Sequence, residues 1–131
     1  MSRQPSEHAI QNAGRNALVD DGLYFRANVG TAWTGDAQKL PDGSILIRNP
    51  RRFSTGLPAG FSDTFGLTRE IITPDMVGTV NARFTAIEYK AGKGKPKPEQ
   101  VNFANAIKAN GGRAGFAWSV ADALEIVRGA L

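Results

Sequence analysis

The stretch that decides the expected fold is residues 83–118, which read RFTAIEYKAGKGKPKPEQVNFANAIKANGGRAGFAW. Residues 83–90 have the composition of a strand. Residues 91–98 hold three lysines among glycines and prolines, which predicts a flexible basic loop. Apolar residues at helical spacing then predict a helix over 98–110 that ends at a Gly-Gly pair, and 114–118 is a short apolar run typical of a strand.

The flanking segments predict further helices and strands. We expect a helix over 6–20 with Ser6 as its N-cap, a strand over 24–29, a hairpin of 32–38 and 44–48 around Pro41-Asp42-Gly43, a loop over 49–60, a strand from near Phe61 that carries Asp63, and a last helix over 120–128 capped by Ser119. This order predicts an α/β fold with a mixed β-sheet flanked by α-helices. At 131 residues, we expect the chain to form a single domain over 1–131.

Composition excludes several classes of protein. With no cysteine and one histidine, the chain lacks a disulfide framework, a thiolate nucleophile and a multi-histidine metal site. No apolar run is long enough to span a bilayer, and the polar opening residues do not resemble a signal peptide, so we expect a soluble intracellular protein. The net charge of +4 favours an anionic partner, with nucleic acid ahead of an acidic membrane surface.

Glu88 and Lys90 form the first candidate site. They are two residues apart on an expected strand, so both side chains leave the same face, while Ile87 and Tyr89 are expected to pack beneath the sheet. Asp63, on the earlier expected strand, can supply a second carboxylate. A pair of carboxylates beside an ammonium suits a hard divalent cation such as Mg²⁺ and the water that it activates.

This set of residues points to phosphodiester hydrolysis. Lys90 would position or deprotonate the attacking water, Glu7 could add a ligand, and Gln100 could hydrogen-bond the water or Lys90. The alternative for Glu88 and Lys90 is an ordinary salt bridge on a surface strand. An ATPase is disfavoured because the glycine-lysine stretch 92–95 lacks the P-loop pattern.

A series of motifs resembles a known family. Glu7 in the opening helix, RANVG at 26–30, GFSD at 60–63, IEYK at 87–90, Gln100 and GGRAG at 111–115 occur in the order seen in VRR-NUC domains, the virus-type replication-repair nucleases of the PD-(D/E)XK superfamily. The similarity runs from about Ser6 to the end of the chain and is closest to the stand-alone phage and bacterial type. It implies a restriction-endonuclease-like core.

The resemblance also implies the roles of particular residues. Asp63 and Glu88 would be metal ligands, with the Tyr89 carbonyl as a possible further ligand and Glu7 in or beside the metal shell. Lys90 would be the catalytic lysine, and Mg²⁺ or Mn²⁺ the cofactor. Small stand-alone members act as homodimers resembling Holliday-junction resolvases, which agrees with the two symmetry-related centres that symmetric junction cutting needs.

Basic and polar residues outside this set are candidates for DNA contacts. These are Arg26 and Asn28 on one strand face, Arg51 and Arg52 in a mobile loop, and Lys93, Lys95 and Lys97 beside the cleft. For each group the alternative is a solvated surface charge or an exposed sheet face. Trp33 and Trp118 are expected to be packing residues.

The sequence therefore predicts a metal-dependent, structure-selective DNA endonuclease. We expect a homodimeric junction resolvase that acts on branched or four-way DNA, in the cytoplasm of a bacterial or phage-infected cell. The alternatives are a flap or end-processing nuclease, or a non-catalytic nucleic-acid-binding module that keeps the fold.

Overall fold

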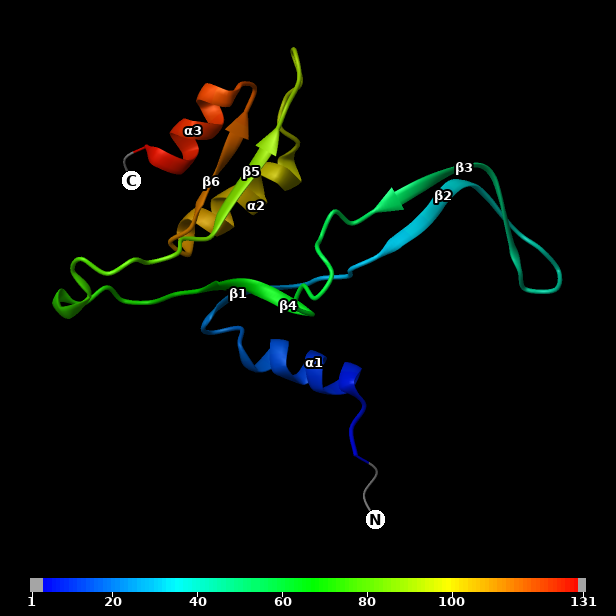
Figure 1. Ribbon diagram of the computed structural model, residues 1–131, viewed down its shortest axis with the longest axis horizontal. Helices are drawn as coiled ribbons and strands as arrows, with labels where there is room; N and C mark the ends of the chain where they lie inside the picture. Colours follow the sequence, from blue (N-terminus) through cyan, green and yellow to red (C-terminus); the bar gives the residue numbers. More distant parts are fainter. Residues whose placement is uncertain (1–3, 130–131) are drawn as a thin grey trace. The chain divides into compact units, whose positions relative to one another are not determined.

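A computed structural model describes residues 4–129 and shows that this part of the chain mixes helices with small parallel and antiparallel sheets (Figure 1). In chain order the elements are α1 (Glu7–Ala17), β1 (Gly22–Arg26), β2 (Thr31–Lys39), β3 (Ile45–Ser54), β4 (Thr64–Thr68), the 3-10 helix η1 (Pro74–Met76), β5 (Thr85–Tyr89), α2 (Pro98–Ala109), β6 (Arg113–Ala117) and α3 (Val120–Arg128). The α/β class expected from the sequence is confirmed, and the restriction-endonuclease-like core stays a prediction. The expectation of one mixed β-sheet is wrong for residues 4–129, because their strands form three separate two-stranded sheets. In the described range no helix is both long and apolar enough to cross a membrane.

The chain divides into two compact units. One unit combines the residues up to Tyr24 with those from Gly66 onward, and the other is Phe25–Phe65. Strands β5 and β6 form a parallel pair in the first unit, and β2 and β3 form an antiparallel pair in the second. Strand β1 pairs with β4.

The parallel pair of β5 and β6 lies between two helices (Figure 1). Because Ala86 is paired with Ala114 and Glu88 with Phe116, these side chains share the face that α2 covers. On the other face, the side chain of Ile126 in α3 packs against the bare backbone of Gly115. Residues buried in this layered arrangement are Ala104, Ile107, Ala114 and Ala117. The strand-helix-strand-helix order read from residues 83–128 is thus present.

The end of α2 depends on two glycines. Gly111 has φ +88°, a left-handed conformation that side chains with a Cβ rarely adopt, and it directly follows the C-cap Asn110. A Cβ on Gly112 would lie 2.6 Å from Cγ2 of Ile107 and 3.0 Å from the carbonyl oxygen of Phe84. Since Ile107 is fully buried, the chain can turn from α2 into β6 only where this side chain is missing.

Side-chain hydrogen bonds hold both ends of helix α3. At its start the Ser119 hydroxyl accepts a hydrogen bond from the Asp122 amide at 3.1 Å, which confirms Ser119 as the cap. The Asp122 carboxylate in turn accepts from the Trp118 amide at 2.9 Å. At the other end Arg113 donates to the carbonyls of Ile126 and Gly129 at 3.1 and 2.8 Å, which satisfies acceptors that a helix end leaves open.

The expected hairpin is present, but its second strand is longer than predicted. In the turn, Asp42 accepts hydrogen bonds from the amide and hydroxyl of Ser44 at 2.9 and 2.6 Å. The loop predicted for 49–60 is wrong over its first part, because β3 continues to Ser54. Arg51 and Arg52 therefore lie on a strand, opposite Thr34 and Trp33, and not in a mobile loop.

A bulge explains this extension. The register shifts between Thr34 and Asp36, and Asn49 in the opposite strand has φ +49°. A bulge accommodates Pro50, which lacks an amide hydrogen for the ladder, so pairing resumes beyond it.

Three other boundaries differ from the sequence prediction. Helix α1 ends at Ala17 where 20 was expected, and β1 runs over Gly22–Arg26 where 24–29 was expected. Arg26 is thus the last residue of its strand and Asn28 lies beyond it, so the predicted shared strand face is wrong. Strand β4 begins at Thr64, which leaves Asp63 immediately before the strand and not on it.

We predict that Gly112→Ala lowers the free energy of unfolding by about 1 to 3 kcal/mol, because the new methyl group must displace a buried isoleucine or the Phe84 carbonyl. The matched control is Gly14→Ala in α1, where nothing lies within 4 Å of the new Cβ. Alanine favours a helix over glycine, so this control should be neutral or stabilising by up to about 1 kcal/mol. Urea unfolding of the two variants checks the difference, and equal midpoints would contradict the packing described for α2.

We also predict that the capping role of Asp122 depends on pH. The hydrogen bond from the Trp118 amide, followed by that from Ser119, lowers the pKa of Asp122 below its ordinary value of 3.8. A lowered pKa in the folded state means that the carboxylate stabilises the fold above pH 3.8 and loses this effect as the pH falls through its folded-state value. The difference in melting temperature between the wild type and Asp122→Ala should therefore shrink below pH 3.8, and a constant difference would rule this out.

Candidate functional site

The candidate site is built at the carboxyl end of β5. Glu88 lies on the face of the strand that α2 covers, and Lys90 follows the last residue of the strand. The amide of Lys90 still donates to the carbonyl of Ala117 at 2.9 Å, so its backbone continues the pairing with β6. This pairing holds the two side chains side by side, as their spacing predicts.

Gln100 joins both side chains in one hydrogen-bond network. Lys90 Nζ lies 3.1 Å from Glu88 Oε1 and donates to Gln100 Oε1 at 2.7 Å. The Gln100 amide nitrogen donates to the same Glu88 oxygen at 2.6 Å. The hydrogen bond between Gln100 and Lys90, one of two options that the sequence left open, is present.

The backbone of the basic loop holds Gln100 in place. Gln100 is the third residue of α2, and its Oε1 also accepts a hydrogen bond from the amide of the N-cap, Lys97, at 2.9 Å. Such a bond from the third helical residue back to the cap is half of a capping box. The start of α2 therefore orients the same amide group that contacts the lysine.

Lys90 depends on this network because its side chain is largely buried. The side chain of Lys90 is only 13% exposed, whereas that of Glu88 is 43% exposed. An ammonium with so little solvent around it needs polar partners, and Glu88 and Gln100 supply them. Glu88 Oε2 stays outside the network, so one carboxylate oxygen remains for a ligand.

A depression of about 200 Å³ lies beside this network on the α2 face. Glu88 and Gln100 share its lining with Glu99, Phe103 and Phe116, among other residues of β5, α2 and β6. Sequence reasoning did not single out Glu99 or Phe103. Their position could have indicated them, because both lie in the first two turns of the predicted helix, close to Gln100.

The remaining predicted ligands lie on other elements. Asp63 belongs to the unit 25–65, is exposed, and its carbonyl accepts a hydrogen bond from the Ala27 amide at 2.9 Å. Glu7 is the first residue of α1, where its carboxylate accepts from Gln11 at 3.2 Å. Within residues 4–129 no group of three or more histidine, cysteine, aspartate and glutamate side chains is arranged to hold a metal ion.

Tyr89 departs from its expected packing. Its side chain is 66% exposed, so the prediction that it packs beneath the sheet is wrong. The residue is the last of β5, where the parallel pairing with β6 ends. Its carbonyl remains a predicted metal ligand.

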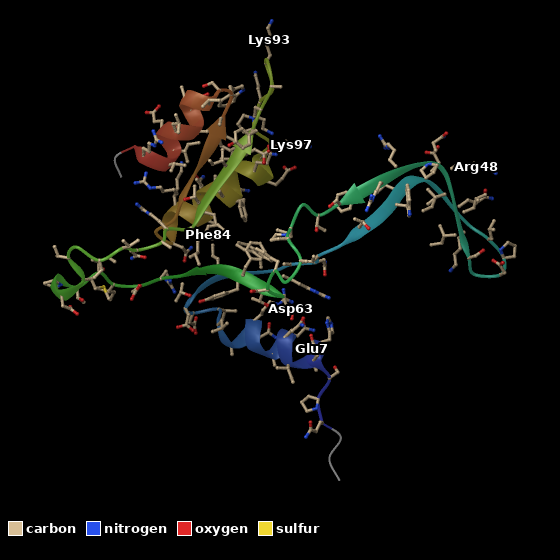
Figure 2. All side chains as sticks on the ribbon, in the orientation of Figure 1. Glu7, Arg48, Asp63, Phe84, Lys93 and Lys97 are labelled. Atoms are coloured by element: carbon tan, nitrogen blue, oxygen red, sulfur yellow. The ribbon has the colours of Figure 1, made fainter. Side chains whose placement is uncertain are left out.

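The predicted DNA-binding residues are all exposed. Arg26 and Asn28 lie at and after the end of β1, and Arg51 and Arg52 lie on β3. Figure 2 shows Lys93 at the tip of the loop after β5 and Lys97 where the loop meets α2. Lys95 lies between them, so the three lysines share one loop, as predicted.

Trp118 has a contact that sequence reasoning missed. Its indole N–H donates to the carbonyl of Gly94 in the basic loop at 3.0 Å, and its ring lies 6.5 Å from that of Phe116. Packing was expected, and it is present only in part, because Trp118 contacts Phe116 but stays 47% exposed. The same expectation is wrong for Trp33, which is 61% exposed on β2. The only available signal for the hydrogen bond was the tendency of a tryptophan N–H to find an acceptor.

The sequence matches no protein-family model, no curated protein and no solved structure.

We predict that Gln100→Leu lowers the free energy of unfolding by about 1 to 2 kcal/mol, because it leaves the shielded Lys90 ammonium with one partner instead of two. The control is Gln38→Leu, an exposed glutamine on β2. Chemical denaturation of both variants checks this, and the network has no importance for stability if the two substitutions cost the same.

Proposed function

We propose that this protein is a Mg²⁺- or Mn²⁺-dependent DNA endonuclease with a restriction-endonuclease-like core, acting as a homodimer on branched or four-way DNA. The observation that carries the proposal is the Lys90 ammonium, which is 13% exposed and bonded to Glu88 at 3.1 Å and to Gln100 at 2.7 Å. A lysine oriented in this way beside a carboxylate is suited to phosphodiester hydrolysis.

A few residues would hold the metal ion. Glu88 offers a carboxylate oxygen outside the hydrogen-bond network, and oxygen donors are what a hard divalent cation prefers. Mg²⁺ keeps several waters and needs only one or two carboxylates, so the residues present fit it; we assign Glu88 and Asp63 as ligands, with Glu7 and the Tyr89 carbonyl as candidates for others. The bound ion would lower the pKa of the attacking water.

Lys90 acts on the attacking water, and Gln100 positions Lys90. The ammonium of Lys90 orients the attacking water and offsets the negative charge that develops on the phosphorane. Gln100 holds that ammonium through its side-chain oxygen, and Lys97 fixes Gln100 in turn. We therefore treat Lys90 as the catalytic residue and Gln100 as a positioning residue.

DNA would be held by the exposed basic residues. Lys93, Lys95 and Lys97 precede and open the helix that carries Gln100, which suits them to phosphates next to the scissile bond. Arg26, Asn28, Arg51 and Arg52 are assigned to more distant backbone contacts. The resemblance to stand-alone phage and bacterial nucleases extends the proposal to the cytoplasm of a bacterial or phage-infected cell.

One observation favours a second candidate, a non-catalytic nucleic-acid-binding module. Gln100 joins β5 to the first turn of α2, so its network also serves as a brace between two elements. A module without activity would keep this brace and the basic loop.

We predict that Lys90→Ala and Asp63→Ala each reduce Mg²⁺-dependent cleavage of a four-way junction by about 100-fold or more, because each removes a group that acts on the reacting water. Lys39→Ala, an exposed lysine on β2, is the charge-matched control and should cut as the wild type does. The variants are compared by single-turnover cleavage at fixed DNA and metal concentrations.

The outcomes separate the candidates. If the wild type cuts with neither Mg²⁺ nor Mn²⁺ but still binds DNA, the non-catalytic module is correct. Equal cleavage by the wild type and by both variants would contradict the roles assigned to Lys90 and Asp63. Equal cleavage of four-way, flap and splayed substrates would leave a nuclease without the preference of a junction resolvase.

A further inference from the structure

A second depression lies at the carboxyl ends of β5 and β6, on the α3 side of the sheet. It measures about 340 Å³ and is lined by Tyr89, Lys90, Trp118 and Ser119 together with apolar residues of α3. The aromatic side chains are accessible, with Tyr89 66% and Trp118 47% exposed. Neither aromatic ring takes part in the network of Glu88, Lys90 and Gln100.

Two hydrogen bonds hold Trp118, which lines this depression, to the basic loop and to the start of α3. Its indole N–H is bonded to the Gly94 carbonyl at 3.0 Å and its backbone amide to Asp122 at 2.9 Å. Gly94 itself closes a turn with Ala91 at 2.9 Å. The ring is therefore attached to the loop that carries Lys93 and Lys95. The aromatic surface of Trp118 thus lies next to a basic loop.

The lining is suited to a flat apolar group that carries negative charge nearby. Val120 and Leu124 are 78% and 41% exposed, and they add apolar surface beside the two aromatic side chains. Nucleobases have such flat faces, and aromatic side chains next to a basic groove are the usual way to bind them in single strands. Bases within a duplex are stacked on one another, so their faces are not available.

We infer that this depression binds an unpaired nucleobase of single-stranded DNA, by stacking on Tyr89 and Trp118, while Lys93 and Lys95 contact the adjoining phosphates. The inference rests on the proposed function and deepens it, because Lys90 lines the depression and also belongs to the candidate active site. Stacking does not read base edges, so binding should tolerate any sequence. Unpaired nucleotides next to the cut would then favour branched or frayed DNA over a plain duplex.

The experiment uses the two tryptophans of the chain as separate reporters. In EDTA, so that no cleavage occurs, oligo(dT) is titrated against the full-length Trp33→Phe and Trp118→Phe proteins. We expect quenching of tryptophan fluorescence in Trp33→Phe, which keeps Trp118, and its loss in Trp118→Phe. A blunt duplex of the same length should quench neither protein.

A second pair of variants tests the affinity. Tyr89→Leu should weaken oligo(dT) binding roughly tenfold. Phe53→Leu, a comparably exposed aromatic residue on β3, is the matched control and should have no effect. Far-ultraviolet circular dichroism checks that each variant is folded.

Several results would overturn the inference. These are quenching that follows Trp33, equal affinity of Tyr89→Leu and wild type for oligo(dT), or a concentration-dependent change in Trp118 fluorescence without DNA, which would assign the depression to a second copy of the chain. Junction cleavage by the wild type without Trp118 quenching would leave the proposed nuclease intact. Quenching without any metal-dependent cleavage would support the binding site and exclude the nuclease.

Discussion

A shielded ammonium is the constraint on which the candidate site depends. The side chain of Lys90 is 13% exposed, so its ammonium needs polar partners, and the two that it has come from β5 and from the first turn of α2. Gln100 is the third residue of α2, so the helix start that ends the basic loop at Pro98 also brings the Gln100 side chain to Lys90. The same amide also bonds the Lys97 backbone, so the orientation of the lysine and the cap of the helix depend on one another.

The parallel pairing of β5 and β6 determines where the site lies. In parallel sheets the carboxyl ends of neighbouring strands meet at one edge, and ligands commonly bind there. Lys90 and Trp118 are the residues that directly follow the two strands. Lys90 then contacts Gln100 in the first turn of α2, and Trp118 contacts Gly94 in the loop that precedes this helix. The edge therefore combines a charged group, an aromatic surface and exposed lysines.

Much of this arrangement could be predicted from local patterns. The spacing of Glu88 and Lys90 on a strand and the position of Gln100 at a helix start are short-range signals, and the structure has both. The prediction of a loop after Asn49 was wrong because the prolines and glycines of 49–60 are typical of a loop, whereas a bulge at Asn49 and Pro50 lets β3 continue. That outcome depends on the partner strand, which composition does not reveal.

The tertiary parts of the site are harder to predict. Tyr89 alternates as a buried residue should, yet it is 66% exposed because the sheet pairs only two strands and ends there. The bond from Trp118 to Gly94 joins residues 24 positions apart, and no periodicity signals it. Asp63 was assigned beside Glu88 from its place on an earlier expected strand and from the order of motifs, and it belongs to the other compact unit.

The most direct test of the account is the anomalous scattering of Mn²⁺ in a crystal of the wild-type protein. The account predicts an Mn²⁺ peak at the carboxylate of Glu88, with Asp63 as a second ligand and Lys90 still bonded to Gln100. A crystal in which Mn²⁺ binds elsewhere, with Glu88 bonded only to Lys90 and Gln100, would contradict it.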